Sequence, residues 1–229
     1  MRCMFKVICF DLDDTLYKEI DYLKSAYREI AFFAARGDED KREKAYKVMM
    51  EAYYAGGNAF ETLNAFLGLD TPVTHYLDIY RSHLPLICLS TETIKTLDTL
   101  KAEGYIIGLI TDGRSAQQRS KIHMLRLNRW IDKEDIVISE EFGSEKPSLA
   151  NFEYFMQRYP DCNDFTYVGD NPKKDFVAPN ALGWKTICLK NDGRNIHQQS
   201  FEELAKEYLP DTIIESLAEF PKLDKCVSH

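Results

Sequence analysis

The chain has 229 residues, of which 45% are hydrophobic and 29% charged, and its formal net charge is −8. This length permits a well-buried core, as one domain or as one domain with an added lobe. The net negative charge argues against nucleic acid or an anionic membrane as the main partner. The sequence contains no apolar stretch of about 18 residues, so no membrane span is predicted.

The first residues lack a signal-peptide pattern, because the short N-terminal apolar run is followed at once by acidic residues. The six cysteines form no CxxC pair. A reduced, cytoplasmic protein is therefore expected. The oligomeric state stays open, and a monomer is compatible with the composition.

The first predicted element is a strand over residues 5–10, a β-branched and aromatic run that fits a buried parallel strand. It ends in Asp11 and Asp13, which are two residues apart, so an extended backbone points both side chains to the same side. Two carboxylates held together repel each other unless a cation or a proton intervenes. For this pattern alone, a solvated acidic turn is the competing interpretation.

Residues 17–85 then show helical spacing of apolar residues and no convincing strand. Four amphipathic helices are predicted, within 20–36, 45–55, 60–67 and 72–84. Glycines close the first three, and Pro72 suits the first turn of the fourth. We interpret this segment as a helical lobe inserted into an α/β domain formed by residues 1–16 and 86–229.

After residue 86 helices and strands alternate. Helices are expected over 91–103, 115–125, 149–156 and 172–182 and around 217, and strands over 105–110, 136–138, 165–168, 184–189 and 212–214. This alternation predicts an α/β fold with a doubly wound parallel sheet, a Rossmann-like core.

Ligands bind such sheets in the crevice at the carboxyl ends of the strands. If the first, second and fourth strands lie side by side, five polar residues gather there: Asp11, Asp13, Thr111, Asp170 and Asp175. So many carboxylates need a cation, and oxygen ligands without His or Cys favour Mg²⁺.

Four motifs carry a family resemblance: DxDxT at Asp11–Thr15, a Thr at position 111, a lone Lys146, and GDxxxxD from Gly169 to Asp175. With these motifs in this order, the chain resembles the haloacid dehalogenase-like superfamily of hydrolases over nearly its whole length. The resemblance implies that the helical lobe, residues 17–85, is a cap domain between the first and second motifs.

The resemblance also implies roles for individual residues. Asp11 would be the nucleophile that forms an aspartyl-phosphate. Asp13 would be the general acid and then the general base, which predicts a raised pKa. Mg²⁺ would be held by the Asp11 carboxylate, the Asp13 carbonyl and the Asp170 carboxylate. Asp175 would orient Lys146 or lie outside the first ligand shell, or it would serve only as an acid at a helix start.

The phosphoryl oxygens would be bound by the Thr111 hydroxyl, the backbone N–H groups of Asp112 and Gly113, and the Lys146 charge. Alone, Lys146 would be interpreted as an exposed lysine before a proline. Asp14 is given no chemical role.

The predicted function is a Mg²⁺-dependent phosphatase of a small phosphorylated metabolite, because dehalogenase members of the family lack the second aspartate, Asp13. Two alternatives remain open: a phosphomutase of the same superfamily, and a non-catalytic binding or regulatory module on this fold.

Overall fold

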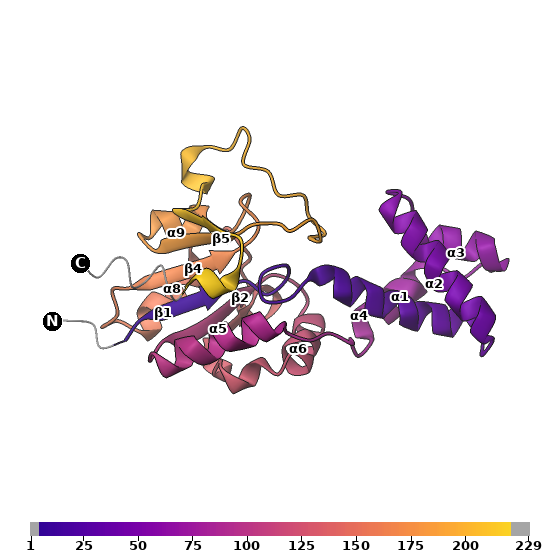
Figure 1. The fold of residues 1–229 in the computed structure, drawn as a ribbon, viewed down its shortest axis with the longest axis horizontal. Helices are drawn as coiled ribbons and strands as arrows, with labels where there is room; N and C mark the ends of the chain where they lie inside the picture. Colours follow the sequence, from indigo (N-terminus) through magenta and orange to yellow (C-terminus); the bar gives the residue numbers. More distant parts are fainter. Residues whose placement is uncertain (1–4, 221–229) are drawn as a thin grey trace. The chain divides into compact units, whose positions relative to one another are not determined.

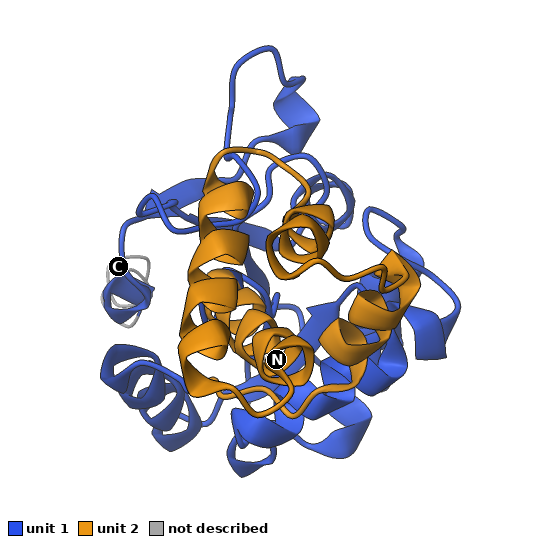
Figure 2. Cartoon of the chain, turned by 90° about the vertical axis from the view of Figure 1, so that its right-hand side faces the viewer, with its two compact units in different colours: residues 1–19, 88–229 blue, residues 20–87 orange. Residues whose placement is uncertain are grey.

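The computed structural model describes residues 5–220. The chain forms two compact units, coloured in Figure 2, which are described separately. Unit 1 contains the chain up to Glu19 and again from Cys88 onward, and unit 2 contains Ile20–Ile87. Within residues 5–220, no helix is both long enough and apolar enough to cross a membrane.

Unit 1 is built on a six-stranded sheet in the order β3-β2-β1-β4-β5-β6, and every pairing is parallel (Figure 1). The predicted doubly wound α/β fold is confirmed. β1 lies between β2 and β4, with Phe10 opposite both Leu109 and Val168, so three strand ends lie together. The strands are β1 Val7–Phe10, β2 Ile106–Thr111, β3 Ile136–Ile138, β4 Phe165–Gly169, β5 Lys185–Leu189 and β6 Thr212–Ile214.

The helices of unit 1 connect these strands. They are α5 Thr91–Ala102, α6 Ser115–Met124, α7 Ser139–Phe142, α8 Ala150–Arg158 and α9 Val177–Ala181, with 3₁₀ turns at Leu127–Arg129, Lys133–Asp135, Lys206–Tyr208 and Leu217–Glu219. The helix predicted over 172–182 is wrong in its first half. Asn171–Lys174 form a turn instead, which returns Asp175 to the backbone of Asp170 and Asn171.

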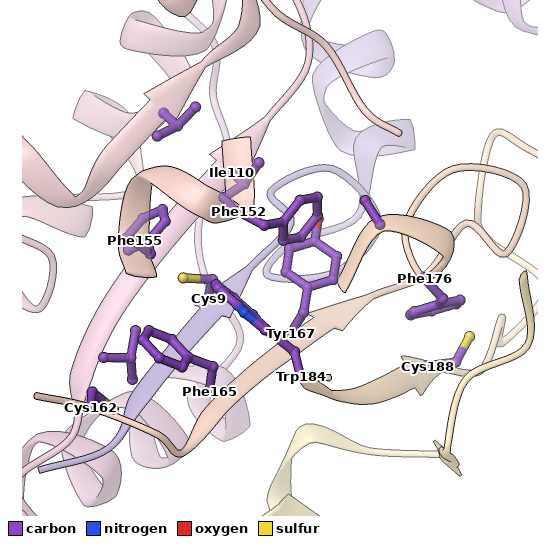
Figure 3. Packing of buried hydrophobic residues seen from close by; sticks show 13 residues of the cluster. Cys9, Ile110, Phe152, Phe155, Cys162, Phe165, Tyr167, Phe176, Trp184 and Cys188 are labelled. Atoms are coloured by element: carbon purple, nitrogen blue, oxygen red, sulfur yellow. The ribbon is translucent and has the colours of Figure 1, made fainter. Parts of the chain in front are cut away.

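The hydrophobic core fixes the relative positions of the strands (Figure 3). All four residues of β1 are buried, as a central parallel strand requires. Phe152 of α8 lies edge-on to Tyr167 of β4, with ring centroids 5.0 Å apart. On β2, a Cβ added to Gly108 would lie 2.5 Å from the Phe155 ring, so only glycine permits α8 to pack this close.

Unit 2 consists of helices α1 Glu19–Ala35 (from Ile20 on), α2 Glu39–Tyr54, α3 Ala59–Leu67 and α4 Val73–Ser82. The Asp38 and Asn58 side chains cap α2 and α3 by accepting backbone N–H groups of the first turn. In its interior, Tyr76 is fully buried, stacks on Phe60 and donates its hydroxyl to Asn64 Oδ1 at 2.7 Å. No strand occurs in this segment, as the sequence pattern indicated.

Candidate active site

The site lies in unit 1, where β1, β2 and β4 end next to each other. Asp11 directly follows β1, and its N–H donates to Val168 O of β4 at 2.8 Å. Asp13 follows two residues later, Thr111 ends β2, and Asp170 directly follows β4. The gathering of these residues at one edge follows from the strand order alone.

Lys146 is the central cation of the site. Its side chain is fully buried, and its Nζ lies 2.6 Å from Asp11 Oδ1 and 2.7 Å from Asp175 Oδ1. The Tyr167 hydroxyl is 2.9 Å away. Lys146 is therefore not the exposed lysine that its sequence context alone would predict.

Asp11, Asp170 and Asp175 form a buried acidic cluster in which one carboxylate oxygen of each lies within 4.8 Å of the others. Asp175 is the member whose two carboxylate oxygens both accept hydrogen bonds. It accepts Lys146 through Oδ1, and the backbone N–H groups of Asp170 and Asn171 through Oδ2 at 3.1 and 2.8 Å. A Cβ at Gly169 would lie 2.5 Å from Asp175 Oδ2, so glycine is required for this turn.

The other two acids each have one oxygen in use. Asp11 accepts through Oδ1 from Lys146, and Asp170 through Oδ2 from Asn195 Nδ2 at 2.8 Å. Among residues 5–220, no group donates to Asp11 Oδ2 or to Asp170 Oδ1. Three carboxylates against one lysine leave two formal negative charges, and hard oxygen donors of this kind suit a divalent cation.

The pKa values of both acids reflect this imbalance. Burial raises the pKa of Asp11 to about 7, with Lys146 opposing the shift and Asp175 adding to it. Burial also raises the pKa of Asp170 to about 8, and repulsion from Asp11 and Asp175 contributes. In the absence of a cation, these two groups therefore hold protons near neutral pH.

Asp13 has a different environment, made by α6. Lys121 Nζ lies 2.7 and 2.8 Å from its two oxygens, and Gln118 Nε2 donates to Oδ2 at 3.0 Å. The Tyr17 hydroxyl also donates to Asp13. Lys121 is almost completely buried.

The predicted raised pKa of Asp13 is wrong for this environment. Burial favours the neutral form, but the charge and hydrogen bonds of Lys121, with Tyr17 and Gln118, outweigh it and lower the pKa below its ordinary value. Glu19 is a more distant partner of this lysine than Asp13. Its carboxylate is 3.9 Å from Lys121, and burial with repulsion from Asp13 raises the pKa of Glu19 to about 8.

The sequence prediction missed Gln118 and Lys121. The available signal was their spacing of three on the helix that follows Thr111, in line with the buried residues Ile122 and Leu125. Nothing in that spacing indicates Asp13 as the partner, because Lys121 and Asp13 are 108 positions apart in the sequence.

In the predicted phosphate-binding segment, Thr111 to Gly113, the groups form hydrogen bonds with side chains of neighbouring residues and with the backbone of Lys146. Thr111 Oγ1 accepts from Gln118 Nε2 at 2.6 Å. Asp112 contributes its carboxylate, which accepts Lys146 N at 3.0 Å and Lys174 Nζ at 3.1 Å. The Gly113 N–H, predicted to face phosphoryl oxygens, donates to Ser139 Oγ at 2.9 Å.

Asp14 has a role that the sequence analysis did not assign. It is buried, adopts a left-handed backbone with φ of 57°, and accepts the N–H of Glu19 through Oδ1 and of Ile196 through Oδ2, both at 3.0 Å. It therefore connects the loop after β1 to the loop after β5.

Sequence comparison agrees with this geometry. The profile of the haloacid dehalogenase-like hydrolases matches residues 8–189. The chain belongs to this family. The resemblance inferred from the four motifs is thereby confirmed.

Two similar curated proteins carry the same name, glyceraldehyde 3-phosphate phosphatase. The one from Methanocaldococcus jannaschii is 30% identical over 92% of this chain and 96% of its own length. The one from Methanothermobacter thermautotrophicus is 25% identical over 96% of this chain and 100% of its own length. A ribulose-1,5-bisphosphate 5-phosphatase from Halopiger xanaduensis is 26% identical over 63% of this chain and 60% of its own length.

Solved structures share the fold. The HAD-hydrolase YfnB from Bacillus subtilis, crystallised with magnesium, has a TM-score of 0.66 at 19% identity and covers 96% of this chain and 98% of its own. A 2-haloacid dehalogenase from Pseudomonas syringae pv. Tomato has a TM-score of 0.61 at 19% identity, over 97% and 99% of the two chains. Since dehalogenases and phosphatases share this fold, the fold alone does not select the reaction.

Proposed function

We propose that the protein is a Mg²⁺-dependent phosphatase that hydrolyses small phosphorylated metabolites through an aspartyl-phosphate on Asp11. The observation that carries the proposal is the pair Asp11 and Asp13. They stand two residues apart at one strand end, and each contacts a different buried lysine, Lys146 for Asp11 and Lys121 for Asp13. The phosphatase names of the similar proteins support the same reaction.

Asp11 is the proposed nucleophile. Its carboxylate oxygen attacks phosphorus, the bond from phosphorus to the ester oxygen breaks, and an acyl phosphate forms on Asp11. Lys146, 2.6 Å from Asp11, fixes the carboxylate and places a positive charge beside the incoming phosphoryl oxygens. Thr111 supplies a hydroxyl at the neighbouring strand end.

Asp13 is the proposed acid and base. In the first step its carboxyl proton passes to the departing ester oxygen. In the second step its carboxylate takes a proton from water as that water attacks the phosphorus, which returns Asp11 to a free carboxylate. The lowered pKa of Asp13 leaves it ionised before substrate binds. A bound phosphate ester is itself an anion, so it raises the pKa of Asp13 toward the protonated form needed first.

The residues that would hold Mg²⁺ are Asp11 and Asp170 through their carboxylates and Asp13 through its carbonyl. The two carboxylate oxygens without donors, Asp11 Oδ2 and Asp170 Oδ1, and the excess of negative charge fit such an ion. Bound there, Mg²⁺ would neutralise charge on the acids and on the phosphoryl group.

We further propose that unit 2 serves as the cap domain that selects the substrate, and that the substrate is a phosphorylated compound of sugar size. The names of the relatives, glyceraldehyde 3-phosphate and ribulose-1,5-bisphosphate phosphatases, support three- to five-carbon sugar phosphates as the first candidates to test. A closing cap would also control the entry of water.

The test is phosphate release from glyceraldehyde 3-phosphate, ribulose-1,5-bisphosphate, a nucleoside monophosphate and an aryl phosphate, with Mg²⁺ and with chelator. Release that requires Mg²⁺ and disappears in Asp11→Asn is the expected result. Asp98→Asn, at an exposed aspartate on α5, is the matched control and should retain full activity. Absence of release from every compound would favour a mutase or a binding module.

A further inference from the structure

The loop between β5 and the 3₁₀ turn at Lys206 reaches the acidic cluster. Two of its side chains contact Asp170. Asn195 Nδ2 donates to the carboxylate at 2.8 Å, and Gln199 Nε2 donates to the main-chain carbonyl at 2.6 Å. None of the four family motifs includes this loop.

The orientation of the Asn195 amide is fixed by chemistry. Its Oδ1 accepts from Lys18 Nζ at 2.8 Å, and a lysine ammonium can only donate. Its Nδ2 faces a carboxylate oxygen, which accepts. The flipped amide would set oxygen against oxygen and nitrogen against ammonium, so only one orientation satisfies both partners.

This contact restrains a carboxylate that otherwise turns easily. The last torsion of an aspartate is broad and roughly two-fold, so a free carboxylate samples many orientations. The Asn195 amide holds Oδ2 and leaves Oδ1 without a donor among the described residues, on a side chain whose carboxylate lies near that of Asp11. An uncharged donor restrains Asp170 without neutralising it.

We infer that Asn195 is a positioning residue that orients Asp170 for Mg²⁺ and thereby sets the affinity of the protein for the ion. The inference rests on the proposed function, since it takes Asp170 as a metal ligand. Lys18 acts one step further out, because it holds the amide that holds the carboxylate. Groups behind a metal ligand commonly change metal affinity by about 10–100-fold when removed.

The loop itself is held independently of the Asn195 side chain. The Ile196 N–H donates to Asp14 Oδ2, and Gln199 also donates to Leu189 O at 3.0 Å. Removal of the Asn195 amide therefore leaves these anchors in place. This separation allows a role in orienting Asp170 to be distinguished from a role in folding the loop.

The experiment titrates the metal-free protein with MgCl₂ alone in a calorimeter. It compares the wild type with Asn195→Ala, Asn195→Leu of similar size, and Gln198→Ala. Gln198 is an exposed amide in the same loop and is the matched control. The expected result is a dissociation constant raised about 10–100-fold in both Asn195 variants and unchanged in Gln198→Ala. Lys18→Met should raise it by a smaller factor.

Hydrogen exchange at the Ile196 N–H reports whether the loop keeps its anchor on Asp14. Weaker Mg²⁺ binding with this N–H still protected supports the inference. Unchanged binding in both Asn195 variants overturns it. Weaker binding accompanied by loss of protection also overturns it, because the effect then belongs to the folding of the loop.

Phosphate release by the wild type separates this inference from the proposed function. A wild type that binds Mg²⁺ but hydrolyses nothing contradicts the phosphatase and leaves the role of Asn195 intact. The opposite result contradicts only the inference. In that case the wild type hydrolyses substrate with Mg²⁺, and the Asn195→Leu variant binds Mg²⁺ with the same affinity as the wild type.

Discussion

Replacement of Asp170 by asparagine should stabilise the metal-free protein. The pKa of Asp170 is raised from 3.8 to about 8, first by burial and then by repulsion from Asp11. Between these values the folded chain holds a proton that the unfolded chain has lost, so stability falls as pH rises through this window. At 1.36 kcal/mol per pKa unit, the penalty at pH 7 is at most about 4 kcal/mol.

An asparagine side chain does not titrate in this range, so the Asp170→Asn variant escapes this penalty. Relief of even half of it, about 2 kcal/mol, would raise Tm by roughly 4–8 °C for a chain of this size. The assay is thermal unfolding in chelator at pH 5 and pH 8, where the gain should be small at pH 5 and large at pH 8. In saturating Mg²⁺ the wild type should become the more stable of the two proteins. Only the wild type is stabilised by the ion, by about 2.7 kcal/mol when the Mg²⁺ concentration is 100 times its dissociation constant.

Asp192→Asn is the control for this experiment. A hydrogen bond from Arg194 lowers the pKa of Asp192, so its carboxylate carries no such penalty and its removal should not stabilise the protein. The electrostatic reasoning is refuted if Asp170→Asn is no more stable than the wild type in chelator at pH 8. An equal gain at pH 5 and pH 8 would refute it as well.

Three further perturbations test other parts of the structure. Lys121→Met leaves the partly buried Asp13 without its cation and should cost at most about 3–5 kcal/mol at pH 7 in denaturant unfolding. The loss should shrink toward pH 4 as Asp13 takes a proton, and a pH-independent loss would contradict the ion pair. Gly108→Ala should destabilise by at least about 1–3 kcal/mol because its Cβ meets Phe155 and Cys9, whereas Gly57→Ala, with one contact at 3.4 Å, should change the unfolding midpoint little. Lys146→Met should abolish Mg²⁺-dependent phosphate release, and a variant that retains wild-type turnover would remove Lys146 from the mechanism.

The fold was predictable because the signals for it are local. The buried run of β1, the glycines that end helices of unit 2 and the alternation of strands with helices are all properties of neighbouring residues. The turn at Asn171–Lys174 was not predicted, because its shape comes from Asp175 folding back to accept two backbone N–H groups. A helical pattern after a proline contains no trace of that requirement.

The candidate site was predictable only as far as its motifs reach. Asp11 and Asp170 follow from strand ends, and Lys146 follows only from the family resemblance that the order of the motifs implies. Gln118, Lys121 and Asn195 do not, because each is a common polar residue whose partner lies more than 20 positions away or on another element. Tertiary structure alone pairs them with the acids.

The missed lysine explains why two aspartates in one motif behave oppositely. Burial raises the pKa of Asp11 to about 7, because Lys146 is shared with Asp175, and the attraction of Lys146 and Lys174 does not offset burial and the repulsion from Asp175. Burial opposes ionisation of Asp13 as well, but both of its oxygens contact Lys121, and this charge with the hydrogen bonds of Tyr17 and Gln118 lowers its pKa. The alternation of the strand places both side chains on one side but says nothing of the cations opposite them. Burial acts on both acids in the same direction, and the balance of charge and hydrogen bonds around each decides which one is ionised.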